Sequence, residues 1–185
     1  MRASILLLTL LASGSLATSA HAQQKPAKQP AAKAGVHRPA VPKAIGRFDD
    51  WTAATDQEAG QSVCYAFTRA AASTPALPGR GDVVLTVTER PGGRDAVAIS
   101  AGFAYAPNAA VAGVADATTL DFYTAQRSAF ARDGHAAVAA FQRARQLVAK
   151  SPGPKGAVAD TFSLKGFNAA YAAIVKSCPP GKAAP

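Results

Sequence analysis

The chain has 185 residues, of which 20 are Lys or Arg and 11 are Asp or Glu, and its formal net charge is +9. Most of the excess lies outside residues 46–178, where thirteen basic residues are balanced by eleven acidic ones. A nearly neutral segment of this length suits one folded domain, and it excludes a basic nucleic-acid-binding surface as the source of the charge.

The first residues have the features of a secretory leader. Arg2 precedes an apolar run over residues 5–11, and Ala20-His21-Ala22 forms a small-x-small cleavage site. We expect a signal peptide over residues 1–22, with cleavage after Ala22. We expect no membrane span, because the apolar run is far shorter than the ~20 residues that a span requires.

Residues 23–45 consist largely of Lys, Pro, Ala and Gln and contain no acidic residue. This composition predicts a disordered basic linker, because it offers too little apolar surface to fold. The linker is interpreted either as a spacer or as an arm that contacts cell-wall polymer or other anionic envelope material. The domain is expected over residues 46–178, followed by a flexible tail over residues 179–185.

Alternation of apolar and polar residues predicts strands throughout the domain. The expected segments are 48–55, 63–68, 83–88, 97–103, the surroundings of Leu120 and Phe122, the surroundings of Leu147, and 161–164. Gly and Pro residues separate several of these segments, as they do in hairpins. The pattern predicts a mainly β, antiparallel domain, either a sandwich or a partly closed barrel.

Two short helices are expected among the strands. Asp133 can cap a helix over residues 134–143. The second helix is C-terminal, because apolar residues recur there at helical spacing on one stripe, which comprises Phe167, Ala170, Tyr171, Ile174 and Cys178.

Cys64 and Cys178 are the only cysteines of the chain. Both stand at positions that we expect to be buried, and two buried cysteines in an oxidising compartment are expected to form a disulfide. Redox catalysis is the alternative, but the chain lacks the Cys-x-x-Cys spacing that is typical of it.

Four blocks of sequence stand in a fixed order: FDDWT at 48–52, CYAF at 64–67, the strand at 83–90, and residues 161–178 from TFSLKGF to the last cysteine. In order and spacing these blocks resemble the invasion-associated locus B family. The resemblance depends on Phe48, Asp50, Trp51, Tyr65, Gly166, Phe167 and Tyr171. The chain departs from the family at Asp49, where a glycine is common, and at Thr55, where many members have a cysteine.

The resemblance implies a periplasmic or secreted envelope protein of a Gram-negative bacterium, with an immunoglobulin-like β-sandwich and short helices. The founding member of the family is associated with entry into host cells. The resemblance supplies no catalytic residues and no cofactor, and we expect neither in this chain.

The domain contains few residues that could support catalysis. His135 is its only histidine, so a cluster of histidine metal ligands is not expected. Ser100 stands in an approximate nucleophile elbow, with Asp116 or Asp121 and then His135 after it. Because the strand pattern continues through Ser100, we interpret it as a serine on the solvent face of a strand.

Arg80-Gly81-Asp82 lies in a turn before a strand and is a weak candidate for an adhesion site. We expect a non-enzymatic interaction module that binds an envelope protein, a host protein or a wall polymer. The alternative is a periplasmic domain that binds a small molecule or acts as a chaperone, which a concave aromatic pocket or an exposed apolar edge strand would favour.

Overall fold

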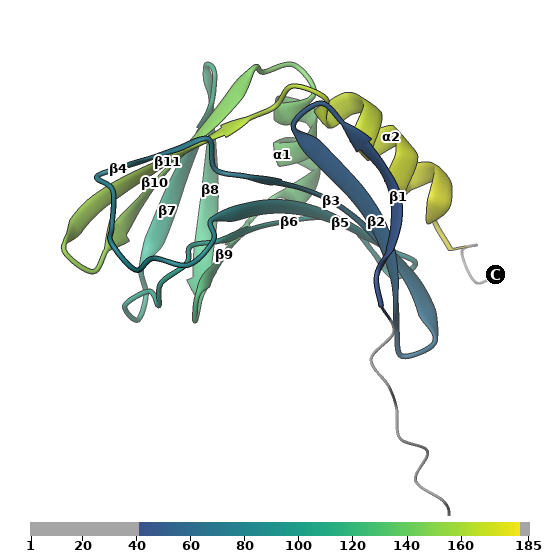
Figure 1. Ribbon diagram of the computed structural model, residues 1–185, viewed down its shortest axis with the longest axis horizontal. Helices are drawn as coiled ribbons and strands as arrows, with labels where there is room; N and C mark the ends of the chain where they lie inside the picture. Colours follow the sequence, from purple (N-terminus) through teal and green to yellow (C-terminus); the bar gives the residue numbers. More distant parts are fainter. Residues whose placement is uncertain (1–40, 182–185) are drawn as a thin grey trace, which may run out of the picture. The chain divides into compact units, whose positions relative to one another are not determined.

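The computed structural model describes residues 41–181, so the expected signal peptide, its cleavage site and most of the linker lie outside the described residues. Within them the chain forms eleven strands and two helices (Figure 1). The bounds are β1 Lys43–Phe48, β2 Trp51–Glu58, β3 Gln61–Arg69, β4 Ala72–Thr74, β5 Val84–Arg90, β6 Gly93–Ser100, β7 Ala110–Ala115, β8 Thr118–Ala125, β9 Ser128–Ala131, α1 Gly134–Phe141, β10 Gln146–Gly153, β11 Gly156–Ser163 and α2 Phe167–Ser177.

The eleven strands form one antiparallel sheet in the order β1-β2-β3-β5-β6-β9-β8-β7-β10-β11-β4. The sheet bends and so has two parts (Figure 1). In the first part, β2, β3, β5 and β6 pass beneath the helices, and in the second part, β7, β8, β10 and β11 run in a steeper direction. A single core cluster draws side chains from both parts of the sheet and from both helices, among them Trp51, Leu85, Phe122, Leu147, Phe141 and Phe167. The expected fold class, an antiparallel sandwich with two short helices, is confirmed.

The chain passes from the first part of the sheet to the edge of the second directly after β3. β3 pairs with β2 and β5 in the first part, and the chain then crosses to β4, which pairs with β11 at the far edge of the second. At the crossing, the amide of Ala71 donates to the carbonyl oxygen of Thr161 at 2.8 Å. The strand that completes the second part therefore comes from an early segment of the chain.

The first part of the sheet has two unlike faces. Cys64, Ala66 and Thr68 of β3 are buried beneath the helices, whereas Tyr65 and Phe67 alternate with them and are half-buried. Figure 1 shows both helices on one side of these strands. Neither helix of residues 41–181 therefore covers the opposite face, which we call the open face and which carries, by strand register, Arg47, Thr52, Tyr65, Phe67 and Thr86.

Both predicted helices are present. Asp133 caps α1 as expected, since its Oδ1 accepts from the amide of Ala136 at 2.9 Å, although α1 ends at Phe141 rather than at residue 143. In α2 the stripe of Phe167, Ala170 and Ile174 is buried against the sheet.

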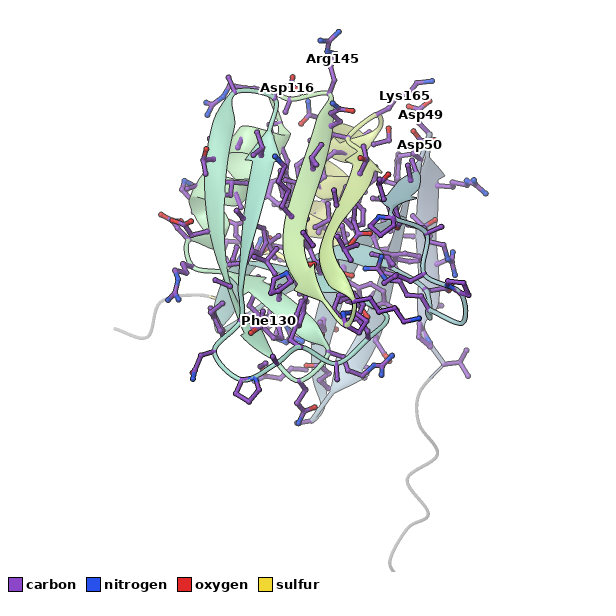
Figure 2. All side chains as sticks on the ribbon, turned by 90° about the vertical axis from the view of Figure 1, so that its left-hand side faces the viewer. Asp49, Asp50, Asp116, Phe130, Arg145 and Lys165 are labelled. Atoms are coloured by element: carbon purple, nitrogen blue, oxygen red, sulfur yellow. A yellow bond between two sulfur atoms is a disulfide. The ribbon has the colours of Figure 1, made fainter. Side chains whose placement is uncertain are left out.

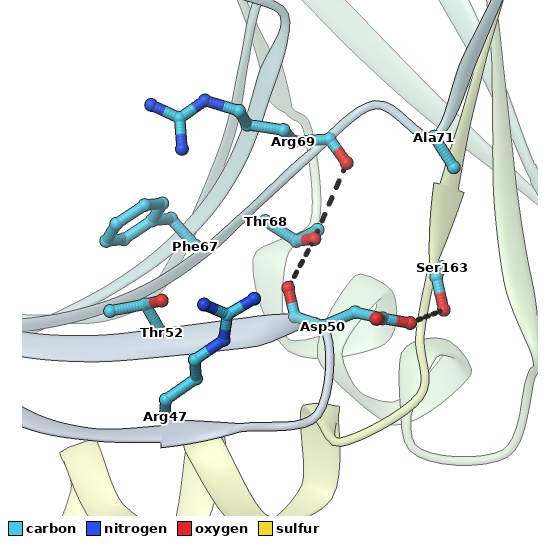
Figure 3. Close-up of a pocket in the computed structure, with 8 residues that line it drawn as sticks. All are labelled: Arg47, Asp50, Thr52, Phe67, Thr68, Arg69, Ala71 and Ser163. Atoms are coloured by element: carbon cyan, nitrogen blue, oxygen red, sulfur yellow. Dashed lines mark hydrogen bonds between the residues drawn. The ribbon is translucent and has the colours of Figure 1, made fainter.

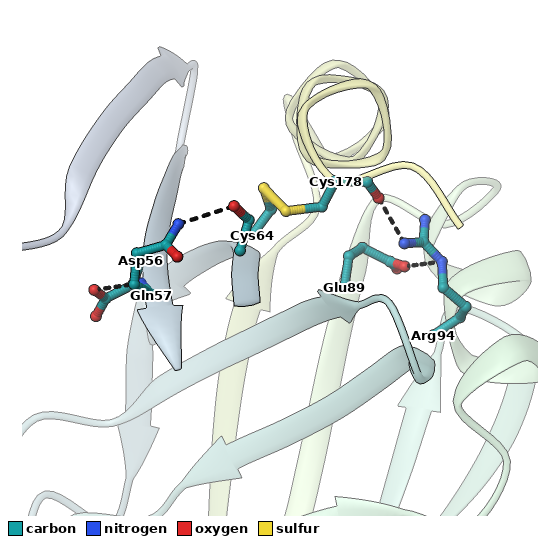
Figure 4. Close-up of a disulfide and its surroundings, with 7 residues drawn as sticks. Asp56, Gln57, Cys64, Glu89, Arg94 and Cys178 are labelled. Atoms are coloured by element: carbon teal, nitrogen blue, oxygen red, sulfur yellow. Dashed lines mark hydrogen bonds and ion pairs between the residues drawn. A yellow bond between two sulfur atoms is a disulfide. The ribbon is translucent and has the colours of Figure 1, made fainter. Parts of the chain in front are cut away.

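The disulfide between Cys64 and Cys178 is confirmed (Figure 4). It joins β3 to the end of α2, with 5.8 Å between the two Cα atoms and a sequence separation of 114 between the cysteines. A closed loop of that length contributes about 4–5 kcal/mol on the chain-entropy account of disulfide stabilisation.

The start of the domain differs from the expectation. A single strand was expected over residues 48–55, but the chain reverses at Asp49 and Asp50, and β1 pairs with β2 in a hairpin. Because β1 begins at Lys43, residues 43–45 belong to the sheet and not to the linker. The backbone of Asp49 has φ +47°, a left-handed conformation that Asp tolerates better than most residues.

Short strands account for the other differences. β4, β7 and β9 were not expected, because their sequences are dominated by Ala, Gly, Ser and Thr and show little apolar alternation. β6 was expected to continue to Phe103, but it ends at Ser100 because the chain turns at Gly102, where φ is +72°.

Candidate functional site

Asp50 joins the β1–β2 turn to the end of β11. Its Oδ2 accepts a hydrogen bond of 2.6 Å from Ser163 Oγ, and its carbonyl oxygen accepts one of 2.8 Å from Thr68 Oγ1. Its amide donates to the carbonyl oxygen of Lys165 at 3.4 Å. These bonds fix the Asp50 side chain beside a pocket, as Figure 3 shows.

Four of the residues that carry the family resemblance pack together behind this turn. Trp51 Nε1 donates to the carbonyl oxygen of Ser163 at 3.0 Å, and the Trp51 ring lies 4.9 Å from that of Phe167. Phe167 also stacks on Tyr171 at 5.7 Å between centroids. Gly166 has φ +87°, and a Cβ there would lie 2.1 Å from the carbonyl oxygen of Phe48. These residues thus hold the hairpin against α2.

Tyr65 is separate from this group. It lies on the open face, where its ring is 6.1 Å from that of Phe67, and burial raises the pKa of its hydroxyl. Its position beside Cys64 in β3 therefore turns it away from the disulfide and toward solvent.

The open face leads into a pocket of about 340 Å³, which we call the Arg47–Arg69 pocket. It lies where the β1–β2 hairpin, the β3–β4 crossing and the end of β11 meet (Figure 3). Two arginines and an aromatic ring form one side of it, and an acid and a hydroxyl form the other. The lining residues are Arg47, Asp50, Thr52, Phe67, Thr68, Arg69, Ala71 and Ser163.

The two guanidinium groups of the pocket are accessible. Arg47 Nε donates to the carbonyl oxygen of Asp49 at 3.5 Å, and among residues 41–181 Arg47 has no carboxylate partner. Arg69 pairs with Asp82 at 3.2 Å, but the two side chains are 67% and 70% exposed. Such an exposed pair contributes about 0–1 kcal/mol, so a ligand can displace it at little cost.

Arg80, unlike Asp82, is not displayed at the surface, which corrects the adhesion hypothesis for residues 80–82. Its side chain is 6% exposed, and its guanidinium donates to both carboxylate oxygens of Asp160 at 2.7 and 2.8 Å. It also donates to the carbonyl oxygen of Ala101 and lies over the ring of Phe103. Arg80 therefore anchors the turn internally and cannot reach a partner.

A second polar cluster lies beside the disulfide. Asp95 Oδ1 accepts from the hydroxyl of Tyr171 at 2.6 Å, and its Oδ2 is 3.0 Å from Nδ1 of His135. Asp95 thereby links both helices to β6. Its amide donates to Oε1 of the fully buried Glu89, and Arg94 forms an ion pair with the other carboxylate oxygen of Glu89.

The carboxyl groups of this cluster differ in pKa. Burial, together with the contact to Asp95, raises the pKa of Glu89 to about 7. Burial also raises the pKa of Asp95, but hydrogen bonds from Tyr171, His135 and Glu89 outweigh it and leave that pKa below its usual range. Arg94 continues the network to the carbonyl oxygen of Cys178 at 2.6 Å (Figure 4).

The residues of the approximate nucleophile elbow do not assemble into a triad. Ser100 ends β6 between Val84 and Ser128, while the ring of His135, which is 88% exposed, bonds to Asp95. Asp116 accepts from the backbone amide of Arg145 at 3.1 Å, near the end of the domain where Figure 2 shows Asp49 and Lys165.

Among residues 41–181, no three His, Cys, Asp or Glu side chains are grouped as metal ligands would be. Neither described helix has the length and apolar character needed to cross a membrane.

Sequence reasoning missed the Arg47–Arg69 pocket. Arg47 and Phe67 are neighbours only through the register of three strands, in which Arg47 pairs with Thr52 and Thr52 with Phe67. Because residues 48–55 were expected to form one strand, β1 and its arginine were not placed on this face. The turn at Asp49-Asp50 has no Asn-Gly or Asp-Gly pair, so the local sequence carries no signal for it.

The chain is similar to known proteins over most of the described domain. A family model described as "Invasion associated locus B (IalB) protein" matches residues 51–175. The crystal structure of invasion associated protein B from Bartonella henselae is similar with a TM-score of 0.53 and 14% sequence identity, over 71% of this chain and 95% of that chain. At this identity the similarity concerns the fold. No curated protein matches the chain.

Proposed function

The chain belongs to the invasion-associated locus B family, and on this premise we propose that it is an exported, non-enzymatic module that binds another protein through its open face. The observation that carries this proposal is the Arg47–Arg69 pocket, with Phe67 half-buried between two accessible guanidinium groups. Arg and aromatic residues are enriched among the residues that dominate protein–protein binding energy.

The architecture supports an interaction role for the open face. The buried face of the first part of the sheet packs against the helices and is committed to the core. Antiparallel sheets can leave their other face to solvent, but polar residues then usually occupy it. On the open face, Tyr65 and Phe67 lie among Thr and Arg residues. The two aromatic rings therefore supply apolar contact area beside charged groups.

The proposed function includes export of the chain from the cytoplasm. A disulfide persists in an oxidising compartment, and the Cys64–Cys178 bridge agrees with the secretory leader that the sequence predicts. We place the mature chain, beginning after Ala22, in the periplasm or outside the cell. The name of the family leads us to include host-cell contact among the settings in which a partner is to be sought.

The alternative role is binding of a small molecule. A volume of about 340 Å³ lies at the lower end of the range of about 300–1,000 Å³ for ligand pockets, and this observation favours it. A chaperone role has less support. The edge strand β1 carries Lys43 and Arg47 and a register shift between Ala44 and Gly46, features that discourage addition of another strand.

Site-specific photo-cross-linking in the living exporting cell tests the proposal. The photoreactive residue p-benzoylphenylalanine replaces Thr52 at the pocket, and in a matched variant it replaces the exposed Thr119 of β8. We expect a discrete protein adduct from position 52 alone, and we expect Arg47→Gln to abolish it. Equal adducts from both positions, no adduct, or an adduct of wall fragments would contradict protein binding at this face.

A further inference from the structure

The two sides of the Arg47–Arg69 pocket carry opposite charges. In Figure 3 the side chains of Arg47, Phe67 and Arg69 lie on one side, and Asp50 and Ser163 lie on the other. A simple anion would be attracted by the arginines and repelled by the acid. A ligand that binds both sides needs a carboxylate facing the two arginines and a hydrogen-bond donor facing Asp50.

The basic side suits a carboxylate. A guanidinium presents paired donors that match the two oxygens of a carboxylate, and such charge-assisted bonds are about twice as strong as neutral ones. Arg47 makes only a long contact to a backbone oxygen, and the partner of Arg69 is an exposed acid. Both side chains can therefore turn to a ligand without breaking the fold.

The acidic side suits a donor. Ser163 Oγ occupies Oδ2 of Asp50, and none of the hydrogen bonds within residues 41–181 uses Oδ1 of that carboxylate. Thr68 donates to the Asp50 carbonyl oxygen and the Asp50 amide donates to the carbonyl oxygen of Lys165, so hydrogen bonds hold the backbone of Asp50 as well as its side chain. Oδ1 is thus positioned to accept from an amide N–H or an ammonium group of a ligand.

We propose that the Arg47–Arg69 pocket binds the carboxyl-terminal end of a peptide chain. The terminal carboxylate lies between Arg47 and Arg69, an apolar terminal side chain packs on Phe67, and a backbone or terminal nitrogen donates to Asp50. The volume of about 340 Å³ accommodates a chain end rather than a folded surface. This proposal rests on the proposed function, because it names what the interaction site recognises.

The proposal is tested by titrating the ¹⁵N-labelled, disulfide-bonded mature chain, residues 23–185, with the dipeptide Ala-Phe and observing amide chemical shifts. The matched probe is Ala-Phe amide, which has the same shape and lacks the carboxylate. We expect Ala-Phe to shift the amides of β1, the Asp49–Asp50 turn and the end of β3, and we expect the amide to bind at least about tenfold more weakly.

Variants of the arginines give the second comparison. Arg47→Gln and Arg69→Gln are each expected to weaken Ala-Phe binding about fivefold or more. Arg90→Gln is the matched control, because Arg90 forms a similar exposed pair with Glu58 at 3.0 Å outside the pocket. The spectra of the free variants report their folding directly.

Three results would overturn the proposal: no shifts with Ala-Phe, equal binding of Ala-Phe and its amide, or unchanged binding in both arginine variants. The two proposals fail separately. Cross-linking from position 52 without Ala-Phe binding would leave the interaction face in place and refute only chain-end recognition. Ala-Phe binding without a protein adduct would refute the protein-binding role and favour the small-molecule alternative.

Discussion

Asp50 and Ser163 are 113 residues apart in sequence, and Ser163 Oγ donates to Asp50 Oδ2 at 2.6 Å. This bond joins the β1–β2 turn to β11, which is the last strand in chain order. Ser163 Oγ also accepts from the amide of Lys165, at the start of the turn into α2. The Ser163 hydroxyl therefore joins three segments that meet at the candidate site: the β1–β2 turn, the end of β11 and the turn into α2.

Ser163→Ala is expected to reduce the free energy of unfolding by about 1 kcal/mol, because the Asp50 carboxylate loses a hydrogen bond at a partly solvated position. Urea denaturation measures the change. Ser62→Ala is the control, because Ser62 accepts a hydrogen bond from the exposed Gln57 side chain, and we expect less than about 0.5 kcal/mol there. Equal losses in both variants would contradict a special role for Ser163.

Gly166→Ala is expected to destabilise the domain by more than about 3 kcal/mol, since it combines a left-handed backbone with a Cβ 2.1 Å from the carbonyl oxygen of Phe48. Gly60→Ala separates the two causes, because Gly60 has φ +79° and open space around it. We expect it to cost about 1 kcal/mol. The midpoints of thermal unfolding compare the variants, and a cost for Gly166→Ala no larger than for Gly60→Ala would refute the clash.

Asp160→Asn is expected to cost about 3–5 kcal/mol, because it leaves the charge of Arg80 buried without its counter-ion. Asp82→Asn is the matched change, since it removes the acid of the exposed Arg69 pair and should cost less than about 1 kcal/mol. Chemical denaturation measures both. A loss at Asp82 comparable to that at Asp160 would show that the buried pair is not the anchor of this turn.

Replacing both cysteines by serine is expected to lower the free energy of unfolding by about 4–5 kcal/mol on the chain-entropy account. The comparison is made by denaturation of the oxidised chain and of the Cys64→Ser/Cys178→Ser variant. We also expect α2 to lose protection from hydrogen exchange before the strands β10 and β11 do. Uniform loss of protection would contradict a local role for the bridge.

The stability of the domain is expected to fall as the pH rises from 5 to 8. The pKa of Glu89 is raised from 4.5 to about 7, so the folded state holds a proton that the unfolded chain releases between these values. The contribution of Glu89 is therefore complete below about pH 4.5 and is lost as the pH rises through 7. The pKa of Asp95 is lowered, so its contribution is lost only in more acidic solution.

Thermal unfolding at pH 5 and pH 8 tests this expectation. Glu89→Gln should remove most of the difference, because glutamine does not titrate. Glu58→Gln is the control, because Arg90 lowers the pKa of Glu58 and that group stays ionised throughout this range. A parent protein that is equally stable, or more stable, at pH 8 would refute the assignment.

The sequence was sufficient for elements with a strong local pattern. The stripe from Phe167 to Cys178 predicts α2 and its buried face, and the sequence at Asp133 predicts the cap of α1. The pairing of Cys64 with Cys178 followed from burial and compartment. In each case a pattern of a few residues determines the structure without reference to distant segments.

The candidate site required information that local patterns do not contain. The two-residue turn at Asp49-Asp50 lacks the Asn-Gly or Asp-Gly signature of a hairpin, so β1 and Arg47 were not recognised. The burial of Arg80 depends on Asp160, which lies 80 residues later in the chain. Strand register and long-range pairing decide both features, and neither has a local sequence signal.

The crossing from β3 to β4 also determines when the domain can be completed. β4 comprises residues 72–74, but its partner β11 comprises residues 156–163. In a chain that becomes available to fold in order from its N-terminus, the β1–β2–β3 meander can form early, whereas β4 can pair only after the β10–β11 hairpin is available. Because contacts between residues far apart in sequence form slowly, we expect the β4–β11 pairing to be the last of the sheet to form. Until β11 is available, residues 72–74 have no strand partner, and we expect a folding factor or a protease to have access to them.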